Sequence, residues 1–161
     1  KIRRPGVNQH DDITIMAIDC APKEIKEYLL REHFKARPDQ LKLIRAQVRR
    51  VTELSGCGAD LADRLVLAVN EACMNVIQHA YRGDPTGEIT LEILNNDNML
   101  MFRIEDSAPP IDLESVQPRD LDDLRPGGLG THFIREIMDD LKMGHLEGGV
   151  GNYLEMTKII T

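Results

Sequence analysis

A carboxylate and an amide lie one helical turn apart in the stretch NEACMNVIQHAY, residues 70–81. Residues four apart stack above one another on a helix, so Glu71, Asn75 and His79 form a polar ridge beside an apolar face. Two interpretations are open at this point. The ridge is a solvated flank, or it is the edge of a pocket where an acid and an amide face the same ligand. The rest of the chain has to decide between them.

A second candidate is the carboxylate that ends the segment MFRIED, residues 101–106. Strand periodicity places Leu100, Phe102, Ile104 and Asp106 on one face. If the apolar side chains face a helical layer, Asp106 points into the same interior, where a carboxylate without hydrogen-bond donors is costly. Either something donates hydrogen bonds to it there, or Asp106 caps the turn that the following residues SAPP allow.

Two glycine-rich segments follow. RPGGLGTHF, residues 125–133, places glycines before a predicted helix, where the backbone can approach a ligand closely and free N–H groups attract phosphate. A plain helix entry explains the same pattern. EGGVGNYLEM, residues 147–156, places three glycines before a strand, and a tight hairpin is its favoured interpretation.

Length and composition bound the kind of protein. The 161 residues, 42% hydrophobic and 29% charged, fit one soluble domain with a real core. The net charge of −7 argues against a general nucleic-acid binder, and no apolar run or signal pattern indicates a membrane segment. Three cysteines without metal-ligand spacing predict a reduced, cytoplasmic chain in which Cys73 is a core residue. Because the chain begins at Lys1, we interpret it as a fragment of a longer protein.

The predicted elements position these candidates in two layers. Apolar periodicity predicts helices from Pro38 to about Leu54, from about Ala59 to Tyr81 and at about 129–140. Strands are predicted at 13–18, 27–36, 88–94, 99–106, 141–147 and 151–160, with Tyr28, Leu30 and Phe34 on one face of the second. This order predicts an α+β, two-layer sandwich, in which helices cover one face of a mixed, mostly antiparallel sheet.

Taken together and in this order, the four segments resemble the nucleotide site of the GHKL ATPase superfamily. The resemblance is closest to the anti-sigma-factor serine kinases of the RsbW and SpoIIAB type. NEACMNVIQHAY resembles the N box, EDSAPPID the first glycine box, RPGGLG the second, and GGVGNYLEMTK the last. The match spans about residues 25–160 and implies the Bergerat (GHKL) fold with a short lid at about 111–127. One departure is that the usual Asp-x-Gly-x-Gly pattern reads Asp106-Ser-Ala108-Pro-Pro110, without either glycine.

The resemblance implies ATP and Mg²⁺ as cofactors and gives the candidates roles. Asn75 would bind Mg²⁺ through its amide oxygen, and Glu71 would be the catalytic base for a serine hydroxyl. Asp106 would accept a hydrogen bond from the adenine amino group, and Arg125 would offset charge on the γ-phosphoryl. We interpret His79 as a structural residue at the helix end. The other expected nucleotide-binding residues are Ala108, Pro110, Gly127, Gly128, Leu129, Gly130, Thr131, Gly151 and Asn152, with the Gly128 and Gly130 amides on the phosphates.

The function implied is an ATP-dependent protein-serine kinase of a bacterial partner-switching pathway. Its substrate would be a STAS-domain anti-anti-sigma protein, and family likeness adds a sigma factor and a homodimer as further partners. No nucleic-acid or membrane partner is expected. The alternative is a nucleotide-gated module that sequesters its partner without phosphotransfer, which the altered first glycine box keeps open. The catalytic domain of a sensor histidine kinase is disfavoured, because the helix at about 38–54 contains no histidine.

The start of the chain carries a further, short resemblance. NQHDDITIMAI, residues 8–18, is similar to the closing segment of PP2C-type serine phosphatases, with Asp11 at a metal-ligand position. We therefore expect residues 1–24 to be the tail of an upstream phosphatase domain with its linker, and residues 25–161 to be the GHKL-type kinase domain. The rest of a phosphatase site is absent from this sequence, so no phosphatase activity is expected.

Overall fold

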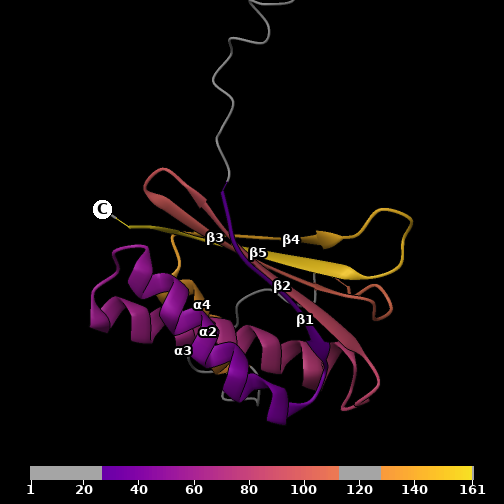
Figure 1. The fold of residues 1–161 in the computed structure, drawn as a ribbon. Coiled ribbons are helices and arrows are strands. Elements are labelled where there is room, and N and C mark those ends of the chain that lie inside the picture. The colour runs from indigo at the N-terminus through magenta and orange to yellow at the C-terminus, as the bar shows by residue number, and fades with distance from the viewer. Residues whose placement is uncertain (1–26, 113–127, 161) are drawn as a thin grey trace, which may run out of the picture.

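The computed structural model describes residues 27–112 and 128–160 of the chain. The predicted strand at 13–18, the phosphatase-like segment, Arg125, Gly127 and most of the expected lid lie outside the described residues. Five strands form one sheet in the order β1-β2-β3-β5-β4, and helices α2, α3 and α4 all lie on one face of it (Figure 1). The predicted two-layer α+β sandwich is thus confirmed. Every described strand pair is antiparallel, so this sheet contains no parallel pairing.

The elements follow the predicted order closely. Their bounds are β1 Glu27–Lys35, η1 Pro38–Gln40, α2 Leu41–Leu54, α3 Ala59–Asn75, η2 Val76–Ala80, β2 Glu88–Asn96, β3 Met99–Asp106, α4 Gly128–Ile137, β4 Asp140–His145 and β5 Asn152–Ile159. Pro38 opens a 3-10 turn before α2, where its missing N–H group costs nothing. No helix in the described ranges is long and apolar enough to cross a membrane.

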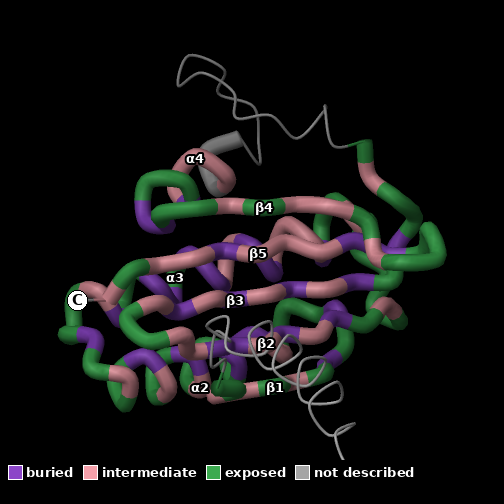
Figure 2. Tube along the Cα trace, turned by 90° about the horizontal axis from the view of Figure 1, so that it is seen from above, coloured by how far each residue is buried: buried purple, intermediate pink, exposed green. Residues whose placement is uncertain are grey.

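The core lies between the sheet and the helices. Along β3 the residues alternate between half-buried and buried (Figure 2), and Leu100, Phe102 and Ile104 are buried against the helical layer. Helix α3 contributes Leu65 and Cys73, both fully buried, which confirms the prediction for Cys73. Burial raises the pKa of the Cys73 thiol to about 12, so this cysteine is an inert core residue.

Strand β1 departs from the predicted alternation at its first residues. A β-bulge lies between Tyr28 and Leu30, because Tyr28 pairs with Leu94 whereas Leu30 pairs with Ile93. The bulge moves Tyr28 off the face that carries Leu30 and Phe34, and leaves it 65% exposed. The prediction that these three side chains share one face is therefore wrong for Tyr28.

The helix that carries the polar ridge changes geometry at Val76. Beyond Asn75 the chain makes a π-helical turn, η2, in which the Tyr81 amide donates to the Val76 carbonyl at 2.9 Å. A π turn takes more residues per turn than an α-helix and rotates the following residues around the axis. His79 is consequently exposed rather than aligned with Glu71 and Asn75. The predicted ridge thus has two members, and His79 has no role at its end that the described contacts reveal.

Candidate functional site

A buried carboxylate lies where β3 and β5 end side by side. Asp106 pairs with Asn152 in the ladder, and the two residues are only 6% and 3% exposed. The Asn152 side-chain amide donates to Asp106 Oδ1 at 2.9 Å, and the Ala108 backbone amide donates to the same oxygen at 3.0 Å. The Asn152 backbone amide also stabilises the carboxylate. Both donors with defined distances reach Oδ1, so Oδ2 is the oxygen that a donor from a ligand could approach.

The electrostatics of Asp106 favour such a ligand. Burial raises the pKa of this carboxyl, and the hydrogen bonds from Asn152 and Ala108 offset that effect only in part. The ionised carboxylate would gain from another donor at Oδ2, since a buried charge is stabilised by each hydrogen bond to it. Both interpretations from the sequence thus hold in part: Asp106 caps its own turn through Ala108, and it also faces inward, where Asn152 donates to it.

Asn152 holds the segment that follows Asp106. Its Nδ2 also lies within donating distance, 3.2 Å, of the Pro109 carbonyl, and its Oδ1 accepts from the Ile111 amide at 3.0 Å. These contacts fix residues 106–111 in the absence of the usual glycines. Both polar atoms of the Asn152 side chain are thus engaged with residues 106–111, and its contact with the nucleotide stays a prediction.

Gly151 brings the backbone of β5 against that of β3. Its φ is +100°, and a Cβ at this position would lie 2.4 Å from the Asp106 carbonyl oxygen. Only glycine allows so close an approach together with a left-handed φ. Gly151 therefore keeps Asn152 within reach of the Asp106 carboxylate.

Gly151→Ala should lower the free energy of unfolding by more than Gly148→Ala, by at least about 1 kcal/mol. Gly148 is a matched control because its φ is +88° but a Cβ there has open space within 4 Å. Both changes carry the cost of a left-handed alanine, and only the first also pushes on the Asp106 backbone. Urea titrations of the two variants measure the difference, and equal losses would show that the close approach is unimportant.

Glu71 and Asn75 lie on α3, one turn apart and both half-buried. Neither side chain has a hydrogen-bond or ion-pair partner among the described residues. On their far side, Ala72 and Cys73 are buried in the core, which fixes the helix against the sheet. Both side chains are thus free to contact a ligand or solvent, and the pocket-edge interpretation stays a prediction.

Helix α4 begins at Gly128 and packs on α3, the helix that carries Glu71 and Asn75, with Ile134 and Ile137 buried. The first four N–H groups of a helix have no acceptor within the helix, and here they belong to residues 128–131. Such groups bind anions, and the helix dipole adds to the attraction. Gly128 and Gly130 thus belong to the first turn of this helix.

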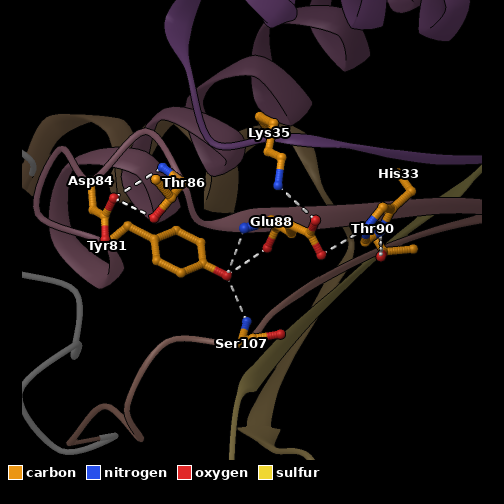
Figure 3. A network of polar contacts seen from close by, with 8 residues as sticks. All are labelled: His33, Lys35, Tyr81, Asp84, Thr86, Glu88, Thr90 and Ser107. Atoms are coloured by element: carbon orange, nitrogen blue, oxygen red, sulfur yellow. Dashed lines mark hydrogen bonds and ion pairs between the residues drawn. The ribbon is translucent and has the colours of Figure 1, made fainter.

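Sequence reasoning assigned no role to Tyr81 beyond its place in the motif. In the structure its hydroxyl contacts the first residue of β2 and the residue that follows Asp106 (Figure 3). The signal in the sequence was an aromatic residue with a hydroxyl at the end of the polar helix, but its partners are distant along the chain.

The comparisons with known proteins agree with this geometry. Residues 34–158 match the family model of the histidine kinase-like ATPase domain. The serine-protein kinase RsbW of Listeria monocytogenes is 33% identical over 121 residues, which cover 70% of this chain and 77% of that protein. RsbW of Bacillus licheniformis is 29% identical over 133 residues, which cover 78% and 81%. RsbW of Bacillus subtilis is 28% identical over 121 residues, which cover 70% and 76%.

Solved structures share the fold at lower identity. The SiaB–SiaC complex from Pseudomonas aeruginosa matches with a TM-score of 0.62 at 13% identity, covering 94% of this chain and 99% of that one. The RsbU and RsbW domains of Rv1364c from Mycobacterium tuberculosis match with a TM-score of 0.57 at 17% identity, covering 81% of this chain. The chain spans 32% of that longer structure. At these identities the likeness shows the fold alone.

Protein-serine kinases and sensor histidine kinases both use this fold. The relatives reported above are protein-serine kinases, which favours the first of these two classes. With a family model matched over residues 34–158 and a relative 33% identical across 77% of its length, the chain belongs to the histidine kinase-like ATPase domain family, in the branch of the RsbW serine-protein kinases, and it is an ATP-using protein-serine kinase.

Proposed function

We propose that this kinase transfers the γ-phosphoryl group of ATP to a serine of a STAS-domain anti-anti-sigma protein in a partner-switching pathway. The observation that carries the proposal is Glu71 on α3, half-buried, unpaired among the described residues and one turn before Asn75. In the transfer, a bond forms between the serine oxygen and the γ-phosphorus while the bond to the β–γ bridging oxygen breaks. Glu71 takes the serine proton, and ADP leaves with the bridging oxygen.

The adenine end of the nucleotide is assigned to Asp106. Its free Oδ2 would accept a hydrogen bond from the exocyclic amino group of adenine, which supplies the missing donor in the buried site. Ala108 and Asn152 support this role indirectly, since both donate to Oδ1 and leave Oδ2 for the base. Gly151 supports it through its close approach to the Asp106 backbone.

The phosphate end is assigned to the start of α4 and to Asn75. The amides of Gly128 and Gly130 would bind phosphate oxygens, and Arg125 is proposed to offset charge on the γ-phosphoryl. The half-buried amide of Asn75 fits a hard cation that prefers oxygen ligands, so we propose that it holds Mg²⁺. When bound, Mg²⁺ supplies neutralisation of charge on the phosphates.

The partner is proposed on chemical and structural grounds. A chain of the SiaB–SiaC complex from Pseudomonas aeruginosa shares the fold, and its presence in a complex supports a second protein as the binding partner of this chain. The proposal extends to a sigma factor bound by the same kinase and to a homodimer. The serine-protein kinase relatives favour a protein serine as the acceptor rather than a small molecule.

The test is a transfer assay with labelled ATP, Mg²⁺ and each STAS-domain protein of the source genome. We expect label on a serine of one of them, and no label with the Glu71→Gln variant. A nucleotide-gated binder remains the second candidate, because Ala108 and Pro110 stand where the first glycine box of the family has its two glycines. A partner that binds in an ATP-dependent way but never acquires label would support this second candidate instead.

Asn75→Ala should remove most of the effect of Mg²⁺ on ATP affinity while the protein stays folded. Alanine is the better helix former, so we expect a melting temperature that is equal or higher. Calorimetric titrations with ATP, with and without Mg²⁺, give the two affinities. Asn70→Ala is the matched control, because Asn70 lies on the same helix but its side chain accepts a hydrogen bond from Arg45. If Mg²⁺ still tightens ATP binding to Asn75→Ala as it does in the parent chain, Asn75 is not the ligand.

A further inference from the structure

The hydroxyl of Tyr81 joins backbone groups from two separate parts of the chain (Figure 3). It donates to the Glu88 carbonyl at 2.5 Å, and it accepts from the Glu88 amide at 3.2 Å and from the Ser107 amide at 2.7 Å. A phenol hydroxyl has one proton to donate and lone pairs to accept, and here all of them have partners. One side chain thus bridges the start of β2 and the residue after Asp106.

The ring of Tyr81 is placed by the π turn and by a glycine. The turn η2 continues the helix of Glu71 and Asn75 as far as Tyr81, whose amide donates to the Val76 carbonyl. A Cβ on Gly87 would lie 2.6 Å from ring atoms of Tyr81, so the ring packs directly on the backbone at that glycine. The position of the hydroxyl is therefore set by the helix on one side and by the approach to β2 on the other.

Glu88 is the anchored end of this bridge. Its carboxylate accepts from Lys35 Nζ at 2.8 Å and lies 3.0 Å from His33 Nε2, both on β1 (Figure 3). The turn before it is closed by Asp84, whose Oδ1 accepts from the Thr86 amide and hydroxyl at 2.9 and 2.7 Å. Glu88 also belongs to the ladder, opposite Lys35.

Ser107 is the end that depends on the bridge. It lies outside β3, which ends at Asp106, and its side chain is exposed. The residues on either side of it form the carboxylate site: Asp106 supplies the oxygens, and the Ala108 amide donates to Oδ1. A shift of Ser107 would therefore move the carboxylate and one of its two donors together.

We infer that Tyr81 is a positioning residue, which holds the Ser107 amide and thereby fixes the Asp106 carboxylate relative to the helix of Glu71 and Asn75. The inference rests on the proposed role of Asp106 in binding adenine. It assigns to Tyr81 an effect on recognition of the base, transmitted through Asp106, and no contact with the nucleotide. The same helix would then carry the catalytic base, the Mg²⁺ ligand and the residue that places the adenine site.

The test is Tyr81→Phe, which keeps the ring against Gly87 and removes only the hydroxyl. Calorimetry is run with ATP and with purine riboside triphosphate, which lacks the exocyclic amino group. We expect ATP affinity to fall about 2- to 10-fold, the scale of one ordinary hydrogen bond, while the affinity for the analogue changes less than twofold. Transfer at saturating ATP should stay within about twofold, because the reacting end of the site is untouched.

Two controls separate positioning from general loosening. Tyr28→Phe makes the same chemical change at a tyrosine that is 65% exposed, and it should change neither affinity. In the Asp106→Asn background, Tyr81→Phe should cause no further loss of ATP affinity, since residues that act through one another are not additive. An equal loss for both nucleotides, or a fully additive loss in the double variant, would overturn the inference.

Further measurements keep the outcomes distinct. Hydrogen exchange of the Ser107 amide in the parent chain should be slow, and fast exchange there would overturn the inference even if Tyr81→Phe does not fold. If the parent chain fails to prefer ATP over the analogue, the proposed adenine role of Asp106 fails. If the parent chain shows that preference and Tyr81→Phe keeps it in full, only the role of Tyr81 fails.

Discussion

The Glu71→Gln variant should bind ATP about as tightly as the parent chain and still dock its partner, while phosphotransfer falls at least about a hundredfold. A general base contributes roughly 10²–10⁴-fold to a rate and little to ground-state binding. Glutamine keeps the shape and the hydrogen-bonding reach of glutamate but cannot take the serine proton. Because Glu71 has no partner among the described residues, the change breaks no described contact. The measurement is a single-turnover transfer assay alongside calorimetry and a melting curve on one preparation.

The control for Glu71→Gln is Glu53→Gln. Glu53 is an exposed residue of α2 whose Oε1 lies 4.0 Å from an Arg49 guanidinium nitrogen. Its substitution makes the same change in charge on a different helix. It should leave transfer and binding unchanged. Transfer at a near-parental rate in Glu71→Gln would place the base elsewhere, and loss of nucleotide binding together with a lower melting temperature would indicate damage to the fold instead.

The layered fold was predictable because its signals are local. Period-two alternation located β3, and helical periodicity located α2 and α3, in each case within a few residues of the observed bounds. Glu71 and Asn75 were singled out for the same reason: two polar residues four apart interrupt an apolar helix face. Their half-buried positions follow from the place of that ridge beside the apolar face.

Two features of the backbone could not be read from local patterns. The bulge in β1 depends on pairing with β2, so alternation within β1 alone misplaced Tyr28. The π turn at Val76 rotates His79 away from the ridge, although the sequence there continues a helical pattern. Such turns depend on how the helix end packs, which the spacing of apolar residues does not encode.

The contacts that shape the carboxylate site are also long-range. Asn152 lies 46 residues from Asp106, and Ser107 lies 26 residues from Tyr81. The sequence predicted that Asp106 needs donors, but only the register between β3 and β5 shows that Asn152 is one of them. It also shows how the segment keeps its shape without the usual glycines: Asn152 binds both Pro109 and Ile111. In the altered box, hydrogen bonds from the Asn152 side chain thus fix the conformation that glycines would otherwise allow.

The second large effect is expected at Asp106. Asp106→Asn should weaken ATP binding about ten- to a hundredfold, because Oδ2 becomes an amide that faces the adenine amino group, a donor against a donor. A hydrogen bond to a charged group is worth roughly 1.5–3 kcal/mol, which corresponds to that range. GTP, which presents a carbonyl at the same place, should bind poorly to the parent chain and lose much less in the variant. Calorimetry with both nucleotides measures the change in preference.

Stability should move in the opposite direction from ATP binding, which distinguishes a recognition role from damage to the fold. Burial raises the pKa of Asp106 in the folded chain, so the ionised carboxylate opposes folding at every pH above that pKa, and the penalty fades as pH falls through it. Asparagine removes the charge but keeps an oxygen for the donors of Ala108 and Asn152, so the melting temperature at neutral pH should be equal or higher. Asp140→Asn, at an exposed position on β4, controls for the change in net charge. Equal affinities of the parent chain for ATP and GTP, or a loss of stability that parallels the loss of binding, would remove Asp106 from the adenine site.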